Sequence, residues 1–281
     1  MKMTNQPFTL RALGLCGADD SVHPNMLIIL AHEYPFVEFG ILFRPDKEGQ
    51  PRYASSAWVQ RLVQQKAILS QHYKNRDPDM GSCRMKLAAH LCSTRVNDVL
   101  RGDDSFVKDL ISWGFTRVQI NATQVNGVDT SKLQESVPAL VNIANKYPSL
   151  EFIIQRNDET KPLWQGILDF DCIPSNISML MDESKGTGIL CADKWDSPSP
   201  SAGRSDISVG YAGGIGPDNI RTILEKLQVT AAGHEIWIDM ESRLRSNRNG
   251  QDIFDLDKCY QVIDAVCESG LHSHPQFLTH K

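Results

Sequence analysis

The chain has 281 residues, a formal net charge of -5 and 41% apolar residues, which are ordinary values for a globular protein. An acidic chain lacks the basic excess that neutralises phosphates, and no apolar run is long enough to span a bilayer. These values argue against a nucleic-acid partner and against a membrane partner.

The cysteine content and the N-terminal residues indicate the cellular compartment of the protein. Seven cysteines are an odd number, and none of them has CxxC spacing. The stretch 1–8 is polar and lacks the apolar core of a signal peptide. We therefore expect reduced thiols and a cytoplasmic protein.

Short apolar stretches alternate with helical patterns along the chain. The predicted strands are residues 9–15, 37–43, 85–91, 117–120, 151–155, 178–181, 208–212 and 236–239. The clearest predicted helices are residues 56–71, 105–113, 132–146, 217–227 and 255–268. Eight strands alternating with helices predict an α/β protein with a single (β/α)8 TIM barrel over residues 1–281. An open, doubly wound sheet is the alternative if one strand is miscounted.

The loop 193–206 follows the sixth predicted strand. Its proline and glycine residues leave little room for a full helix there. A long loop on the functional face of a barrel is either a lid or a plain surface loop, and both readings remain open.

Polar residues gather where the predicted strands end, which is where barrel enzymes hold their catalytic groups. Asp182 directly follows the apolar run Met179-Leu180-Met181, so its carboxylate must find a partner or face a cavity. The other candidates are Cys16, Arg52, His90, Gln119, Asn121, Gln155, Asp239 and Glu241. Structural roles are the alternative: Cys16 as a small buried hydrophobe, His90 as a hydrogen-bonded core residue. Glu38 is expected to point into the barrel and make a structural hydrogen bond.

Two glycine pairs follow consecutive strands. Gly186 and Gly188 follow Asp182, and Gly213 and Gly214 precede the helix start at Pro217-Asp218. Backbone N–H groups at such positions can bind an anion.

The motifs resemble those of the phosphoribosylanthranilate isomerase family of tryptophan synthesis, a ribulose-phosphate-binding type of barrel. Six segments carry the resemblance in the family's order: Leu15-Cys16-Gly17, Pro51-Arg52-Tyr53, Val118-Gln119-Ile120, Leu180-Met181-Asp182 with Gly186-Thr187-Gly188, Ala212 to Asn219, and Ile238-Asp239.

The resemblance implies an Amadori rearrangement of an aminoaldose phosphate to an aminoketose phosphate, without a cofactor. By motif match, Asp182 is the general acid, Cys16 the base at C2, and Arg52 the clamp for a substrate carboxylate. Acid and base groups are what a 1,2-proton shift needs. The remaining candidates are expected to line a pocket for a small-molecule substrate, and a homodimer is compatible with this expectation.

The phosphate site departs from the family pattern. The family's eighth strand ends in Ser-Ser-Gly, whereas this chain has Met240-Glu241-Ser242-Arg243. Glu241 would repel a phosphate unless Arg243 or Arg245 compensates. Two alternatives therefore stay open: another barrel enzyme (a lyase, an epimerase or a metal-dependent hydrolase using His90, Asp239 and Glu241), or a non-catalytic ligand-binding barrel. No metal-ligand spacing is present in the sequence, so no metal is expected.

Overall fold

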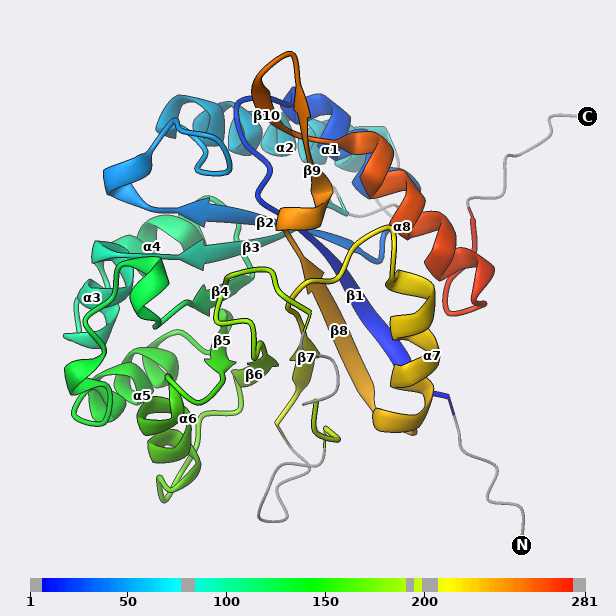
Figure 1. Cartoon of the computed structure of the whole chain (residues 1–281). Helices are drawn as coiled ribbons and strands as arrows, with labels where there is room; N and C mark the ends of the chain where they lie inside the picture. Colours follow the sequence, from blue (N-terminus) through cyan, green and yellow to red (C-terminus); the bar gives the residue numbers. More distant parts are fainter. Residues whose placement is uncertain (1–6, 77–83, 191–194, 199–206, 275–281) are drawn as a thin grey trace, which may run out of the picture.

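The computed structural model describes residues 7–76, 84–190, 195–198 and 207–274. Within them, eight parallel strands close a barrel in sequence order, and the last strand pairs with the first (Figure 1). The strands are β1 Thr9–Cys16, β2 Val37–Phe43, β3 Lys86–Leu91, β4 Arg117–Ile120, β5 Glu151–Arg156, β6 Ile177–Met181, β7 Val209–Tyr211 and β8 Glu235–Met240. The predicted barrel is confirmed, and the open sheet is wrong.

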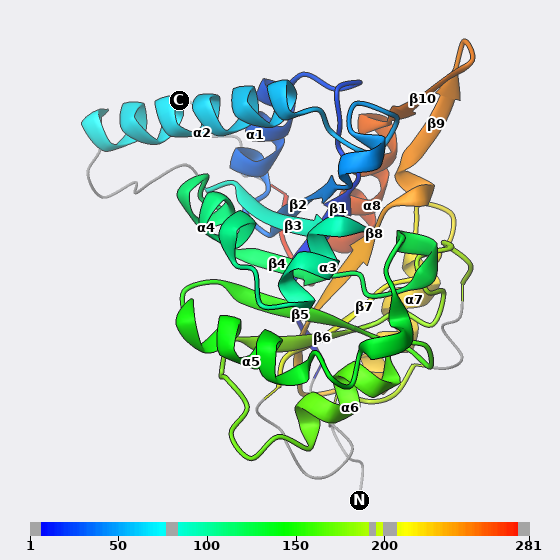
Figure 2. The same ribbon diagram turned by 90° about the vertical axis from the view of Figure 1, so that its left-hand side faces the viewer.

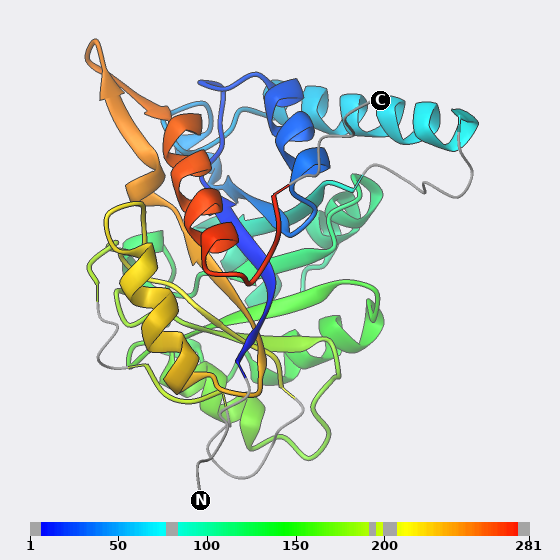
Figure 3. The same ribbon diagram turned by 90° about the vertical axis from the view of Figure 1, so that its right-hand side faces the viewer.

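Helices surround the barrel on its outer face (Figures 1 and 2). They are α1 Pro24–Glu33, α2 Ser56–Arg76, α3 Thr94–Leu100, α4 Ser105–Ser112, α5 Val137–Lys146, α6 Lys161–Leu168, α7 Ile220–Thr230 and α8 Leu256–Glu268. Figure 3 shows α7 and α8 beside β1, where the first and last strands meet.

Two predicted helix starts need correction, and three short helices lie outside the predicted ones. The predicted helix 132–146 begins only at Val137, because a separate 3-10 turn, Thr130–Lys132, precedes it and a proline occupies its first turn. The predicted helix 217–227 begins at Ile220, because the side chain of Asn219 accepts a hydrogen bond from the Gly216 N–H and holds the preceding turn. Helices α1, α3 and α6, each of ten residues or fewer, were not predicted.

The barrel interior is built around Trp237. Its ring packs in a buried cluster with Ala12, Ile153, Leu180 and Ala212, separate from the larger core under the helices. A Cβ atom on Gly210 would collide with the indole ring, so a glycine on β7 makes room for the tryptophan of β8.

Buried charges close the barrel below Trp237. Arg117 donates to Glu38 at 2.6 Å and to Glu151 at 3.1 Å, and its guanidinium lies 4.3 Å from the centre of the indole ring. Glu38 thus makes the inward, structural hydrogen bond that the sequence predicts. This end is packed, so the open end lies at the strand C-termini.

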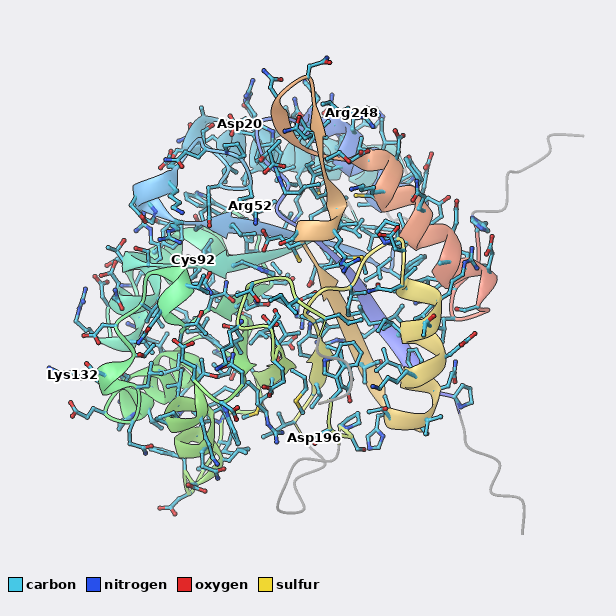
Figure 4. All side chains as sticks on the ribbon, viewed as in Figure 1. Asp20, Arg52, Cys92, Lys132, Asp196 and Arg248 are labelled. Atoms are coloured by element: carbon cyan, nitrogen blue, oxygen red, sulfur yellow. The ribbon has the colours of Figure 1, made fainter. Side chains whose placement is uncertain are left out.

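Two connections at the C-terminal face differ from a simple barrel. Between β6 and β7 the described residues form no helix, as the proline and glycine content predicts, and most of the expected lid, 193–206, lies outside the described residues. After β8, a 3-10 turn, Ser242–Leu244, leads into a projecting hairpin of β9 Arg245–Arg248 and β10 Gln251–Phe254 (Figure 2). Figure 4 shows Arg248 on this hairpin.

None of the helices in the described ranges combines the length and the apolar character that crossing a membrane requires.

Candidate active site

A pocket with about 480 Å³ of empty space, counted out to its open mouth, lies at the C-terminal ends of the strands. Of the predicted site residues, it is lined by Cys16, His90, Gln119, Asp182, Gly186, Gly188, Gly213, Gly214, Asp239 and Glu241. Arg52, Asn121 and Gln155 were expected to line it but instead contact the lining residues from behind or from the rim.

Three buried side chains meet at the floor of this pocket. Cys16 ends β1, His90 is the fifth residue of β3, and Asp239 is the fifth residue of β8. Cys16 Sγ lies 3.8 Å from His90 Nε2, and one oxygen of Asp239 lies within 4.8 Å of both atoms. We call Cys16, His90 and Asp239 the floor cluster.

Two glycines make the floor cluster possible. Gly40 is the register partner of Cys16 on β2, the strand between β1 and β3. A Cβ atom there would lie 2.6 Å from Cys16 Sγ and 2.7 Å from His90 Nε2. Gly14 is the register partner of Asp239, and a Cβ atom there would collide with the carboxylate. Both positions need a glycine because the three functional side chains fill the space.

Burial sets the protonation of the floor cluster. It raises the pKa of the Cys16 thiol well above its usual value, and the negative charges of Asp239 and Glu241 raise this pKa further. Burial and the charge of Arg117 lower the pKa of His90 to about 3. Burial raises the pKa of Asp239 to about 7. Without a ligand, the cluster therefore contains a thiol, a neutral imidazole and a carboxyl near half protonation at neutral pH.

Asp182 is held by four hydrogen bonds. Its Oδ1 accepts from the Ser184 hydroxyl at 2.5 Å and the Ser184 N–H at 3.2 Å, and its Oδ2 accepts from Gln155 Nε2 at 2.6 Å and the Gly186 N–H at 3.2 Å. Gln155 thus orients Asp182 rather than facing the pocket, and the Gly186 N–H is already occupied. These donors fix the carboxylate at the pocket wall.

Gln119 lines the pocket and holds a buried oxygen without a hydrogen-bond donor among the described residues. Its Nε2 donates to Asn121 Oδ1 at 2.7 Å, and Asn121 Nδ2 donates to Cys92 Sγ at 3.7 Å. Gln119 Oε1 is buried and accepts no hydrogen bond from the described residues. A buried, unpaired amide oxygen costs free energy, so this atom suits an N–H or O–H group of a ligand. Asn121 orients it from outside the pocket.

The Arg52 guanidinium is paired with the chain's own carboxylates. Arg52 Nη1 donates to Glu241 Oε1 at 3.0 Å, and Nη2 lies 3.7 Å from Asp252 on the hairpin. Arg52 itself has a positive φ of 72°, and its backbone N–H donates to Asp19. As a substrate clamp, Arg52 would have to exchange these partners. Figure 4 labels Arg52 beside the ribbon of β2.

The charge of Glu241 is compensated by Arg52 in addition to Arg245, whose positive charge also acts on it as the sequence predicts. The partner of Glu241 is Arg52, whereas Arg245 is buried against Asp19, Asp252 and the Gly17 carbonyl. The Arg243 side chain lines the pocket and lies 3.6 Å from Asp218. Burial nevertheless raises the pKa of Glu241.

The two glycine pairs form part of the pocket wall. Gly186, Gly188, Gly213 and Gly214 all have positive φ, which glycine adopts readily. The backbone of Leu190 lies so close to Gly214 that a Cβ atom there would collide with it. The segment after β6 thus covers part of the expected anion site.

The sequence analysis missed several lining residues: Leu180, Ser184, Ala212, Ile215, Met240 and Ser242. Ser184 and Ser242 each follow a strand end closely, and this proximity is the signal that identifies them. The apolar residues carry no such signal.

Solved structures resemble this chain, whereas family models and curated proteins do not. No protein-family model and no curated protein matches this chain. Solved structures that resemble it include the N-(5'-phosphoribosyl)anthranilate isomerase from Pyrococcus furiosus, with 10% identity, a TM-score of 0.48, and coverage of 92% of this chain and 98% of that chain. A dihydrodipicolinate synthase from Agrobacterium tumefaciens str. C58 shares 15% identity at a TM-score of 0.48 over 83% of this chain and 70% of its own.

A third similar structure is a ribulose-1,5-bisphosphate carboxylase/oxygenase from Pyrococcus horikoshii OT3, with 10% identity and a TM-score of 0.48. The match covers 93% of this chain and 59% of the carboxylase chain. Identities this low say nothing of what this chain does; the barrel assignment rests on the strand pairing of the chain itself.

Proposed function

We propose that this barrel is an acid–base isomerase that moves a proton between neighbouring carbons of a small sugar-like substrate. The specific reaction is the Amadori rearrangement of phosphoribosylanthranilate. One observation carries the proposal: Cys16 and Asp182, to which the resemblance gives the base and acid roles, line the same pocket from β1 and β6. A proton shift needs both groups within reach of one substrate.

The pocket wall offers two carboxyl groups for protonating the ring oxygen. Asp182 is fixed toward the pocket by Gln155 and Ser184, and it must enter the reaction protonated to serve as the acid. Glu241 faces the same space from the end of β8 and is oriented by Arg52. Opening the sugar ring needs one of them as acid, and the resemblance favours Asp182.

The charges of the pocket suit the intermediate. The ring-opened imine of an Amadori rearrangement is positively charged when protonated, and Asp182, Asp239 and Glu241 all face the cavity. Preorganised negative groups stabilise positive charge that develops during a reaction. The same groups disfavour a phosphate at the floor, so the phosphate is placed at the rim beside Arg243.

The test is turnover of freshly generated phosphoribosylanthranilate, followed by the loss of its fluorescence. We expect turnover by the wild type, a loss of at least about 100-fold in Asp182→Asn because general acid catalysis contributes about that much, and no change in Asp169→Asn, an exposed carboxylate at the end of α6. A folded wild-type protein without turnover would refute the specific reaction.

A second candidate is a barrel enzyme that uses a metal ion, such as a lyase, an epimerase or a hydrolase. The floor cluster favours it, because cysteine, histidine and aspartate are all common ligands of transition metals. Turnover that depends on an added metal would favour this candidate.

A further inference from the structure

The floor cluster combines three ligand types on three strands, and the barrel brings them to one point. We propose that Cys16 Sγ, His90 Nε2 and one oxygen of Asp239 bind a single zinc-like divalent ion, whose fourth position opens into the pocket. This inference does not depend on the proposed isomerase activity and competes with it for Cys16, because a bound ion would take the thiolate that the isomerase needs as its base. It specifies the ligands and the class of ion for the second candidate, the metal-dependent enzyme. It also revises the sequence expectation of no metal, which rested on spacing along the chain.

The distances are close to those of a loaded site. With metal–sulfur and metal–nitrogen bonds of about 2.3 and 2.0 Å, the ligand atoms of a tetrahedral site lie roughly 3.5 Å apart. Cys16 Sγ and His90 Nε2 are 3.8 Å apart, and all three ligand atoms lie within 4.8 Å of one another. To complete the set, the Asp239 carboxylate would have to move closer to the other two ligand atoms.

Two glycine residues provide the space for this cluster. Gly40 separates Cys16 from His90 in the sheet, and Gly14 lies beside Asp239. A methyl group at either glycine would occupy the position of a ligand atom. Two inward-facing glycines at these registers leave the three ligands free to converge.

The donor set selects the class of ion. A thiolate is a soft ligand that favours zinc and similar transition metals over Mg²⁺ and Ca²⁺. One thiolate and one carboxylate balance the two positive charges of the ion, and neutral His90 adds no charge. Binding would release the thiol proton and any carboxyl proton to solvent.

Neighbouring groups support the ligands. Trp237 Nε1 donates to Asp239 Oδ2 at 3.3 Å, which leaves the other oxygen for an ion. Such outer partners orient ligands in metal sites. Arg117, a buried cation below the cluster, is paired with Glu38 and Glu151, and its charge still acts on His90 and Asp239.

The open fourth position gives the ion a chemical role. All three ligands line the pocket, and so does Gln119. An ion with one exchangeable position polarises a carbonyl group or activates water. With the ion bound, Cys16 is a ligand and no longer the base that the resemblance implies.

The experiment is a Co²⁺ titration of the chelator-treated full chain, followed by the thiolate-to-cobalt charge-transfer band in the near ultraviolet. We expect saturation at one equivalent and loss of the band on adding Zn²⁺. Cys16→Ser should abolish the band, whereas Cys259→Ser, which removes a buried thiol on α8, should retain it. His90→Gln and Asp239→Asn should each weaken binding at least tenfold.

A second variant keeps all three ligands and closes their space. Gly40→Ala should lose the band while circular dichroism shows the fold to be kept; if it unfolds, Cys16→Ser gives the answer instead. No band in the wild type, or a band that survives Cys16→Ser, would overturn the metal site. The titration uses no substrate, so its failure is separate from a failure of the isomerase assay.

Discussion

Arg117 is the side chain whose removal should destabilise the barrel most clearly. Glu38 is only 3% exposed, and its carboxylate accepts from Arg117 Nη1 at 2.6 Å. Arg117→Met keeps much of the apolar stem and removes the charge. In this variant Glu151 keeps its hydrogen bond from Arg11 at 2.8 Å. Glu38 stays buried, and among the described residues no other cationic side chain donates a hydrogen bond to it.

The magnitude follows from that orphaned charge. Breaking a buried ion pair on one side costs about 3–5 kcal/mol, because the remaining ion stays desolvated. Losing the guanidinium 4.3 Å from the Trp237 ring adds about 0.5–2 kcal/mol. We therefore expect Arg117→Met to lower the free energy of unfolding by about 4 kcal/mol, measured by urea denaturation with circular dichroism.

The double variant provides the control. Adding Glu38→Gln to Arg117→Met removes the unpaired buried charge. The free energy of unfolding of the double variant should therefore exceed that of Arg117→Met alone by about 2 kcal/mol or more. A single variant that loses under about 1 kcal/mol, or two changes whose costs simply add, would refute the view that Glu38 is a buried carboxylate dependent on Arg117.

Three further changes test other parts of the barrel. Gly210→Ala should cost about 1–3 kcal/mol or more in urea denaturation, because the methyl group collides with the Trp237 ring; a neutral result would contradict that packing. Asn176→Ala should cost about 1–3 kcal/mol, because Nδ2 donates to three carbonyl groups at the end of α5, and unchanged thermal stability would argue against this cap. Hydrogen bonds from Lys146, Lys108 and Tyr147 lower the pKa of Asp104, so its stabilisation is present above the ordinary aspartate pKa and is lost as the pH falls below it. The urea midpoint of Asp104→Asn should thus lie below that of the wild type at pH 7 and approach it near pH 2; a gap that does not narrow would refute this assignment.

The strands could be predicted because each one is a short apolar run with polar connections. All eight were placed within two residues of their observed ends. Helix starts were harder, because local hydrogen bonds decide them: Asn219 holds a turn that the sequence pattern reads as helix. The short helices α3 and α6 depend on packing against the barrel more than on their own propensity.

The sequence predicts which residues line the candidate site but not which of them contact one another. Strand ends identified most lining residues, since parallel strands bring their carboxyl ends to one face. The contacts between these side chains were not predictable, because they depend on the register of the strands. Cys16 contacts His90 only because Gly40, on the strand between them, has no side chain. The partner of Glu241 is Arg52 of the β2 loop, far away in the chain, so no local pattern could have indicated it.

The seam between β1 and β8 has a consequence for biosynthesis. Cys16 leaves the ribosome long before Asp239 and before β8, the strand that covers the open edge of β1. Until β8 is made, β1 keeps an unpaired edge, and such edges expose nascent chains to aggregation. A translation-arrested chain ending before Glu235 should therefore present Cys16 to a thiol-alkylating reagent, and the onset of its protection in longer chains would mark the moment at which the barrel closes.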